Sequence, residues 1–240
     1  MTPSEAFFTI HRDLPREGPG LPEDVLWALY VAGTPEHARI CDAACGPGAD
    51  TVTLAEARPD ARIDAVDLQA HFLDAARARC QRHGDRVRFR QTDYTSLPGD
   101  YDLIWCAGAM YFEGMETVLD AWRHRLLPGG RVAFSEPAWV SEPPSPEAQA
   151  FWSAEGHVEG LSSLCKRLGQ AGWHILGQRW LIGAPWEAYY APMKDRLGML
   201  RAQDPNEAVA GAIDEAQQEI THWETAPDQI AYVLFVVEPR

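Results

Sequence analysis

The segment Ile40-Cys41-Asp42-Ala43-Ala44-Cys45-Gly46-Pro47-Gly48-Ala49-Asp50 joins the end of a strand, a glycine turn and the start of a helix. The apolar strand pattern ends at Asp42, and a helix is predicted from about residue 49 to residue 57. Gly46 and Gly48 let the backbone turn tightly and let a ligand approach it closely. This order of elements predicts a nucleotide or nucleoside site at the edge of a parallel sheet.

An acidic residue follows the next predicted strand at an informative distance. Asp67 stands 19 residues after Gly48, directly behind the strand-like residues 61–66. A carboxylate at this place can accept hydrogen bonds from both hydroxyls of a ribose. The alternative is that Asp67 only caps the following helix. The glycine turn and the acid together favour the ribose role.

The first half of the chain alternates between strands and helices, which predicts βαβ units and a parallel sheet. The second half differs, because residues 184–224 look helical twice, with a break at 203–205, before a last β-rich run. A further helix is predicted from Pro22, and residues 1–20 show no regular element. The predicted strands are 38–43, 61–66, 87–91, 103–107, 131–135, 173–182 and 230–237. Further helices are predicted around 72–80, 115–126 and 161–168.

The composition excludes several classes of protein. The chain has 240 residues, 46% of them hydrophobic, and carries 21 basic against 35 acidic residues, a formal net charge of -14. This charge opposes binding to nucleic acid or to anionic membranes. The longest apolar run near the C-terminus, Tyr232 to Val237, has six residues, far fewer than the about 20 of a membrane span. We expect no secretory signal, and five cysteines indicate free thiols in a cytoplasmic protein.

The charges around the turn favour one nucleoside over another. A dinucleotide-binding fingerprint has a third glycine where this chain has Thr51, and Asp50 at the start of the helix would repel a pyrophosphate. S-adenosylmethionine has no phosphate and carries an ammonium group and a sulfonium, which suit Asp42. We therefore predict S-adenosylmethionine as the cofactor.

Together these motifs resemble those of the class I S-adenosylmethionine-dependent methyltransferases, in order and along nearly the whole chain. The resemblance implies a Rossmann-like seven-stranded sheet, mostly parallel with an antiparallel last strand, helices on both faces and a helical insert between the last two strands. It also places the carboxylate of Asp93 against the adenine amino group, although Asp93 could instead cap a turn. The matching segments are Asp42–Gly48, Asp67, Gln91–Tyr94, Tyr101–Ala107 and Leu127–Gly130.

A narrower resemblance joins the chain to a group of bacterial small-molecule methyltransferases. It rests on Ile10–Gly20, with Trp186 and Tyr189–Tyr190 in support, and it identifies no acceptor. If the late helices fold over the active edge of the sheet, aromatic residues would line a pocket there; the alternative for them is core packing. These aromatic candidates are Trp139, Trp152, Trp186, Tyr189 and Tyr190. The cofactor-binding residues that the resemblance implies are Asp42, Ala44, Gly46, Gly48, Asp67, Leu68, Asp93, Tyr94, Cys106 and Arg16.

Three residues are candidates for a catalytic role. His11 lies in a segment expected to cover the cofactor, Glu136 follows the fifth strand, and Tyr111 follows the fourth. Each has an ordinary alternative, namely surface packing for His11, an ion pair with an arginine for Glu136 and lid packing for Tyr111. Arg16 either holds a carboxylate or forms a surface ion pair with Glu17 or Asp13. Cys41 and Cys45 lack a second cysteine pair, so no metal site is expected.

We predict one methyltransferase domain over 1–240, with a cap segment (1–33), a cofactor-binding core (34–140) and an insert (184–224) that forms a lid or a dimer contact. The expected reaction is direct displacement by a small-molecule acceptor, since residues 106–110 lack the D/N-P-P-Y/F segment used on nucleobases and glutamine. Expected partners are a small-molecule acceptor and, in a homodimer, a second copy of the chain, without nucleic acid or membrane. Two alternatives stay open: a nicotinamide-dependent oxidoreductase, and a non-catalytic module that binds S-adenosylmethionine.

Overall fold

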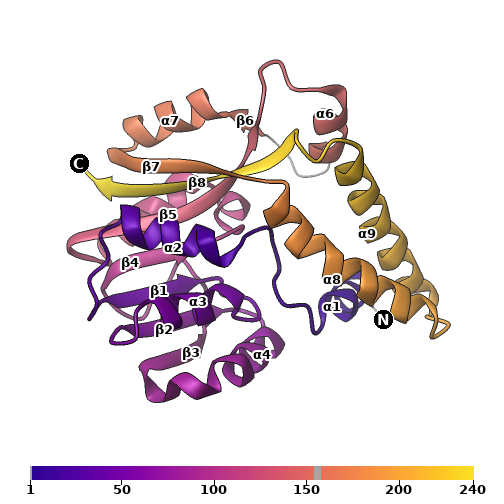
Figure 1. The fold of residues 1–240 in the computed structure, drawn as a ribbon, viewed down its shortest axis with the longest axis horizontal. Helices are drawn as coiled ribbons and strands as arrows, with labels where there is room; N and C mark the ends of the chain where they lie inside the picture. Colours follow the sequence, from indigo (N-terminus) through magenta and orange to yellow (C-terminus); the bar gives the residue numbers. More distant parts are fainter. Residues whose placement is uncertain (1, 154–157) are drawn as a thin grey trace.

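The protein folds around a single mixed sheet, seen in a computed structural model that describes residues 2–153 and 158–240 (Figure 1). The strands lie in the order β3-β2-β1-β4-β5-β8-β7, and the short β6 pairs with β5. Their bounds are β1 Arg39–Ala43, β2 Arg62–Asp67, β3 Val87–Gln91, β4 Tyr101–Cys106, β5 Leu126–Trp139, β6 Glu159–Gly160, β7 Trp173–Ile182 and β8 Ile230–Pro239.

The last strand is antiparallel to both of its neighbours, as the resemblance implied. β8 enters between β5 and β7, with Phe134 opposite Phe235 and Gln178 opposite Phe235 on the other side. The five strands from β3 to β5 are parallel. The predicted Rossmann-like sheet is confirmed, and the two-residue β6 is an addition that the sequence did not indicate.

Helices cover both faces of this sheet because each strand alternates its side chains between two apolar layers. One layer holds residues of α2 and α3 with Ile40, and the other holds residues of α5 and α7 with Cys41. The helix bounds are α1 Pro3–His11, α2 Pro22–Val31, α3 Ala49–Ala57, α4 Ala70–Cys80, α5 Met115–Arg123, α6 Pro146–Trp152, α7 Leu161–Gln170, α8 Ala184–Arg201 and α9 Glu207–Thr225, with short 3₁₀ turns η1 Gln81–Arg86 and η2 Met110–Phe112.

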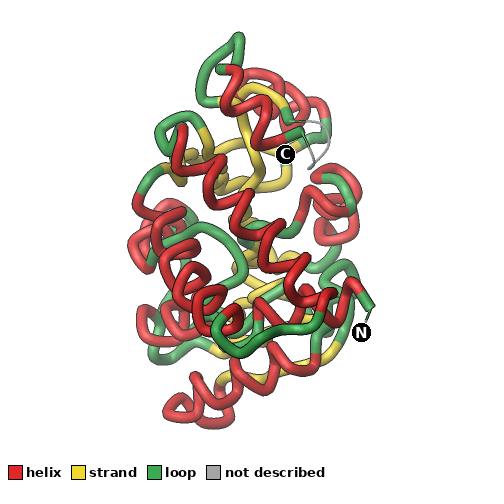
Figure 2. Tube along the Cα trace, turned by 90° about the vertical axis from the view of Figure 1, so that its right-hand side faces the viewer, coloured by secondary structure: helices red, strands yellow, loops and turns green. Residues whose placement is uncertain are grey.

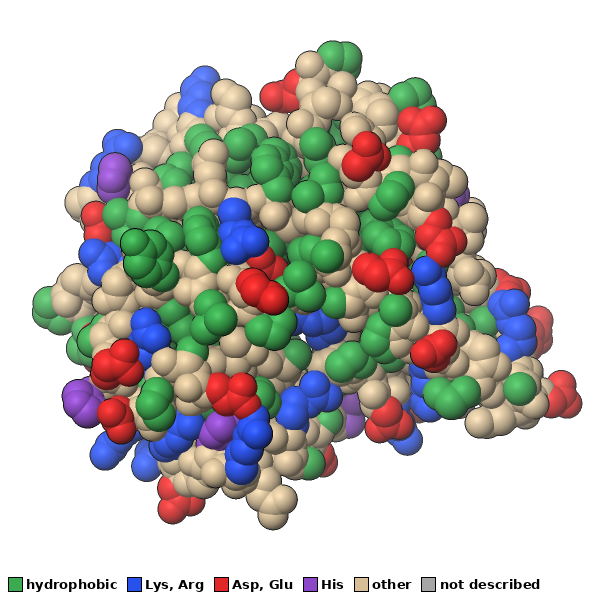
Figure 3. All heavy atoms as spheres, viewed as in Figure 1, with side chains coloured by type: hydrophobic (Ala, Val, Ile, Leu, Met, Phe, Trp, Pro, Cys, Tyr) green, Lys and Arg blue, Asp and Glu red, His purple; other side chains and the backbone are tan. Residues whose placement is uncertain are grey.

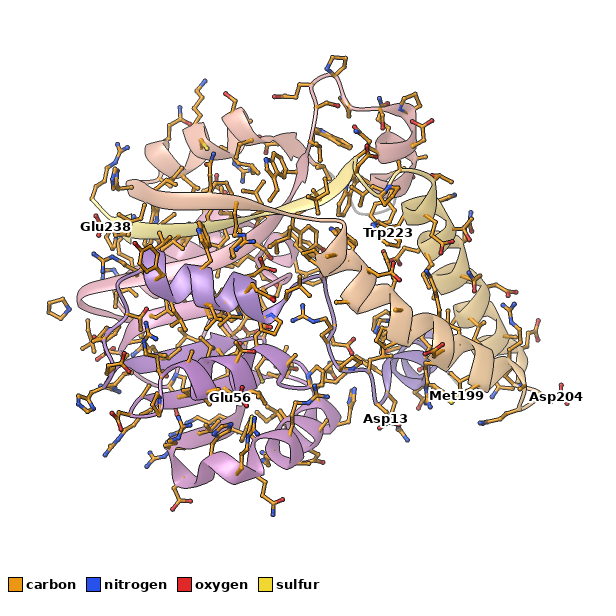
Figure 4. The ribbon with its side chains drawn as sticks, viewed as in Figure 1. Asp13, Glu56, Met199, Asp204, Trp223 and Glu238 are labelled. Atoms are coloured by element: carbon orange, nitrogen blue, oxygen red, sulfur yellow. The ribbon has the colours of Figure 1, made fainter. Side chains whose placement is uncertain are left out.

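The predicted insert between the last two strands is a helical hairpin of α8 and α9. It extends beyond the carboxyl ends of the parallel strands, on the right of Figure 1, and crosses in front of the sheet in Figure 2. α1 packs against both helices, and Arg196 Nη2 donates to the Thr9 carbonyl oxygen at 3.0 Å. In Figure 4, Asp13 lies near the end of α8 that carries Met199. The N-terminal segment and the hairpin thus meet at the edge of the sheet where ligands bind in such folds.

Three elements differ from the prediction. Residues 1–20 contain the helix α1, which begins with a capping box between Thr2 and Glu5 and with Pro3 in its first turn. α6 was also not predicted. The helical stripe expected to continue through Leu126 is wrong there, because α5 ends at Arg123 and Leu126 already pairs with Tyr101 as part of β5.

Acidic and basic side chains are interspersed over the face shown in Figure 3. Among the described residues, no helix combines the length and the apolar character that crossing a bilayer requires.

Candidate active site

The glycine turn after β1 is held by backbone groups of the neighbouring strand. The Cys45 N–H donates to the Val66 carbonyl oxygen at 2.9 Å, and the Gly46 N–H donates to Asp67 Oδ2 at 2.8 Å. Ala44, Gly46 and Gly48 all have positive φ angles, of 58°, 52° and 84°. A left-handed backbone is costly for alanine and cheap for glycine, so the turn stores some strain at Ala44.

Asp67 binds the turn and the next helix at once. Its Oδ1 accepts from the Gln69 N–H at 2.8 Å, while Oδ2 accepts from Gly46. Burial raises the pKa of the Asp67 carboxyl, and the two backbone N–H groups partly oppose this. A carboxylate offers about four lone-pair positions, so Asp67 retains capacity for ribose hydroxyls.

Asp42 lies at the floor of the turn, 2% exposed. Its Oδ2 accepts from the Thr51 hydroxyl at 2.5 Å. Burial raises its pKa to about 8, and the nearby Asp50 adds to the effect. In the free protein Asp42 is therefore largely protonated at neutral pH, and a cationic ligand beside it would favour the charged form.

The N-terminal segment folds back onto this turn. His11 Nδ1 lies 2.6 Å from Glu17 Oε2, and the His11 ring stacks on Phe7 with centroids 4.0 Å apart. Arg16 donates to Asp50 Oδ1 at 2.7 Å and to the Gly18 carbonyl at 3.0 Å. The ion-pair partner of Arg16 is thus Asp50, and neither of the two predicted partners was correct.

One cavity of about 450 Å³ joins the glycine turn, the N-terminal segment and the hairpin. Predicted residues on its wall are His11, Arg16, Asp42, Ala44, Gly46, Asp67 and Tyr111, together with the aromatic candidates Trp152, Trp186 and Tyr189. Residues that the sequence analysis did not single out are Phe7, Glu17, Trp105, Phe151, Glu219 and Tyr232 among others. Most of these come from elements distant in sequence, so no local pattern pointed to them.

Other predicted residues are not on the described cavity wall. Gly48 packs against α4, Leu68 is 52% exposed, and Cys106 is buried in the sheet. Asp93 Oδ1 accepts from the backbone N–H and the hydroxyl of Thr95, which lower its pKa. The Tyr94 hydroxyl donates to the Ala109 carbonyl at 3.2 Å. The cofactor roles of these residues stay predictions.

Glu136 also lies outside the cavity wall. It is 6% exposed, pairs with Val233 across the sheet, and its Oε1 has no hydrogen-bond partner among the described residues. Burial raises its pKa to about 8; Arg167 opposes this shift, while Glu116 and Glu159 add to it. These partners lie on α5, α7 and β6, on the sheet face opposite Tyr232. The structure therefore does not bring Glu136 together with His11 and Tyr111.

An aromatic wall closes the end of the cavity away from the glycine turn, and we define it as Tyr111, Trp152, Trp186, Tyr189 and Tyr232. Ring centroids of Trp186 and Tyr232 are 5.2 Å apart, and those of Trp152 and Tyr232 are 5.8 Å apart. The Tyr232 and Tyr111 hydroxyl oxygens are 3.4 Å apart. These side chains come from η2, α6, α8 and β8. The predicted Trp139 and Tyr190 are not on the described wall.

Known proteins match both the sequence and the fold. The model of a methyltransferase domain family matches residues 40–130. Trans-aconitate 2-methyltransferase of Streptomyces avermitilis is 39% identical over 126 residues, which cover 49% of this chain and 47% of that protein. Demethylmenaquinone methyltransferase of Thermus thermophilus is 33% identical over 135 residues, covering 53% and 59%. The alignments thus span about half the length of these two relatives.

A solved structure extends the match to nearly the whole fold. An S-adenosylmethionine-dependent methyltransferase from Geobacter sulfurreducens, crystallised with S-adenosyl-L-homocysteine, superposes with a TM-score of 0.86 and 20% identity, covering 98% of each chain. These comparisons confirm the resemblance to the S-adenosylmethionine-dependent methyltransferases. The chain has the α/β fold of that solved structure, and the methyltransferase domain model matches its residues 40–130.

Proposed function

We propose that this protein transfers a methyl group from S-adenosylmethionine to a small-molecule acceptor by direct displacement. The observation that carries the proposal is one cavity that holds both the glycine turn with Asp67 and the aromatic wall. The turn offers a site for the nucleoside, and the wall offers a second site for an acceptor. Bringing two reactants together in a fixed geometry is the main contribution such a cavity makes to rate.

The side chains near the turn fit S-adenosylmethionine, which supplies the electrophilic methyl group when bound. Asp67 would accept hydrogen bonds from the ribose hydroxyls. Asp42 and Glu17 would face cationic groups, and Glu17 Oε1 is buried without a partner among the described residues. Burial raises the pKa of Glu17, so a bound cation would lower it again.

Residues of the N-terminal segment and the hairpin would exclude water from the reaction. Glu17 fixes the orientation of the His11 ring through Nδ1, so His11 would accept a proton where the acceptor arrives protonated. We propose that the cap segment 1–33 and the insert 184–224 close over the core 34–140. Glu136 has no contact role in this proposal.

A nicotinamide-dependent oxidoreductase is less well supported. The third glycine of a dinucleotide fingerprint would fall at Thr51, which is fully buried and hydrogen-bonded to Asp42. Asp50 at the start of α3 is already paired with Arg16, so a pyrophosphate would have to displace that pair.

Titration calorimetry separates these candidates. We expect S-adenosylmethionine and S-adenosylhomocysteine to bind the protein, with no heat from NAD or NADP at the same concentrations. Methyl-labelled S-adenosylmethionine, incubated with the protein and a cell extract, should label small molecules and leave DNA, RNA and bulk protein unlabelled. Binding of NAD alone would overturn the proposal, and label found only in macromolecules would overturn the small acceptor.

The proposal also includes a cellular location and binding partners. The five cysteines are free thiols, which suits the reducing cytoplasm that we propose as the site of action. The acidic net charge of -14 disfavours nucleic acid as a partner. We also propose a homodimer with the insert 184–224 as its contact, and sedimentation would measure its mass.

A further inference from the structure

The titratable side chains on the described cavity wall are mostly acidic. Five acidic residues line it, against Arg16 and His11. Arg16 is bound to Asp50 and to the Gly18 carbonyl, and His11 is bound to Glu17. Both basic side chains are therefore already engaged. An acceptor carboxylate in this part of the cavity would therefore meet only basic groups whose charge is already paired with Asp50 or Glu17.

The aromatic wall favours a cationic acceptor over an anionic one. Faces of tryptophan and tyrosine attract cations within about 6 Å of the ring centroid. Trp186 contacts Tyr232 edge to face at 5.2 Å and lies 5.8 Å from Tyr190. Glu219 of α9 lines the cavity beside these rings and accepts a hydrogen bond from the Tyr190 hydroxyl at 2.7 Å. A carboxylate next to several aromatic faces suits an alkylated ammonium.

This step rests on the proposed function. The change in charge during methyl transfer distinguishes amine acceptors from carboxylate acceptors. When an amine attacks, its lone pair forms the new N–C bond, the C–S bond breaks, and its electron pair stays on sulfur. The positive charge passes from sulfur to nitrogen during this step. A product that still carries an N–H can afterwards release a proton to water. Because the methyl-transfer step keeps one positive charge in the cavity, the acidic and aromatic surroundings are complementary to the charge before and after it. A carboxylate acceptor would instead annihilate the charge that these surroundings favour.

We propose that the acceptor is an amine, held with its nitrogen between the aromatic wall and Glu219, and that carboxylates are excluded. The indole of Trp152 indicates a further feature of the acceptor. Trp152 is 4% exposed, and its indole Nε1 has no hydrogen-bond partner among the described residues. This neutral donor fits an uncharged oxygen on the acceptor, since an unsatisfied buried N–H is costly.

Calorimetry on the protein saturated with S-adenosylhomocysteine tests the inference without requiring turnover. The probes are benzyltrimethylammonium, which resembles a methylated amine product, and phenylacetate, which carries a carboxylate on the same ring. We expect the ammonium to bind at least about 10-fold more tightly, as cation–π attraction at a desolvated site predicts. Equal binding, tighter binding of phenylacetate, or binding of neither probe would overturn the amine class.

A matched pair of variants locates the cation site. Glu219→Gln should weaken benzyltrimethylammonium binding about 3- to 10-fold, and Glu215→Gln, a change on the same helix but outside the described cavity wall, should not. Both variants should still bind S-adenosylhomocysteine as the parent protein does. If S-adenosylhomocysteine does not bind at all, the proposed function fails; if it binds but Glu219→Gln leaves the ammonium affinity unchanged, the amine site is misplaced.

Discussion

Asp67 shapes the glycine turn and also lies on the wall of a cavity that holds other acidic groups. It accepts two backbone N–H groups that shape the turn, and it sits in a cavity with Asp42 and Glu17 nearby. Burial raises the pKa of all three carboxyl groups. A cavity that gathers acidic groups at this cost is preorganised for cationic and hydroxyl groups of a ligand.

The first prediction concerns this carboxylate. Asp67→Asn keeps the shape of the side chain but loses its charge, so S-adenosylmethionine should bind about 10- to 150-fold more weakly, the equivalent of about 1.5–3 kcal/mol for hydrogen bonds to a charged group. Asp74→Asn, an exposed change on α4, serves as the control and should bind normally. An unchanged dissociation constant in a folded Asp67→Asn protein would remove the ribose assignment.

Glu136 gives a prediction about pH. Its pKa is raised to about 8 by burial, so between about pH 4.5 and pH 8 the folded protein holds a proton that the unfolded chain has released. The unfolding free energy therefore falls as pH rises through this window, by up to about 1.4 kcal/mol per pH unit from this group. The side chain introduced by Glu136→Gln does not titrate. The unfolding free energy of this variant should therefore rise relative to that of the parent protein as pH rises.

Urea unfolding at pH 5.5 and pH 8 measures the effect. The stability difference between Glu136→Gln and the parent should grow in favour of the variant at pH 8. The exposed Glu215→Gln should show the same difference at both values. A Glu136→Gln difference that does not change with pH would mean that the buried carboxyl already carries its charge at pH 5.5.

Residue positions were predictable where they depend on local spacing. The turn glycines and Asp67 are close in sequence to the strands that place them, and the structure puts Gly46 and Asp67 in direct contact. The Arg16–Asp50 pair joins residues 34 positions apart, and no periodicity marks such a partner. The sequence placed Glu136 after the fifth strand, but β5 runs on to Trp139. Alternation along the strand sends the Glu136 side chain to the sheet face opposite the cavity, a direction that proximity to the strand end does not reveal.

At the scale of elements, the start of α3 lies against α4 without room for a side chain. A Cβ built on Gly48 would lie 2.8 Å from Ala76 Cβ, and the φ angle there is +84°. Gly129 has a similar φ of +78° but nothing within 4 Å. The two glycines therefore separate the cost of backbone conformation from the cost of helix packing.

Alanine variants of these two glycines make the third prediction. Gly129→Ala should cost about 1–2 kcal/mol of unfolding free energy for its left-handed backbone. Gly48→Ala should cost about 1–3 kcal/mol more, because α3 and α4 would have to move apart. Urea midpoints measure both, and equal losses would show that the α3–α4 contact yields easily.

Most strands and core helices could be predicted, because the parallel strands are short apolar or alternating runs and their helices carry an apolar stripe. Two elements show why others were missed. α1 depends on a capping box at Thr2 and Glu5 and on packing against α8 and α9, whereas the nearby Pro15 and Gly18 suggested an irregular segment. Leu126 fits a helical stripe, but pairing with Tyr101 draws it into β5.

For the whole molecule, the site exists only where distant parts of the chain meet. The glycine turn lies near residue 46, the N-terminal segment supplies His11 and residues 16–19, and the hairpin supplies Trp186 and Glu219. Arg79 Nη1 donates to the Pro15 carbonyl at 3.0 Å, and Arg196 ties α8 to α1 at Thr9. A ligand in the cavity would touch all three parts and stabilise their arrangement together.

The fourth prediction follows from this arrangement. Residues 8–20 hold five of the lining side chains or backbone groups, namely His11, Arg16, Glu17, Gly18 and Pro19, so S-adenosylhomocysteine should slow amide hydrogen exchange in this segment by restricting its opening. Peptides from the aromatic end of α8 should slow less, because that end faces the acceptor site. Residues 81–86, outside the cavity wall, serve as the internal control and should exchange at the same rate with and without ligand. If calorimetry shows binding while residues 8–20 exchange unchanged, the segment does not cover the cofactor, and the cavity is closed by the hairpin alone.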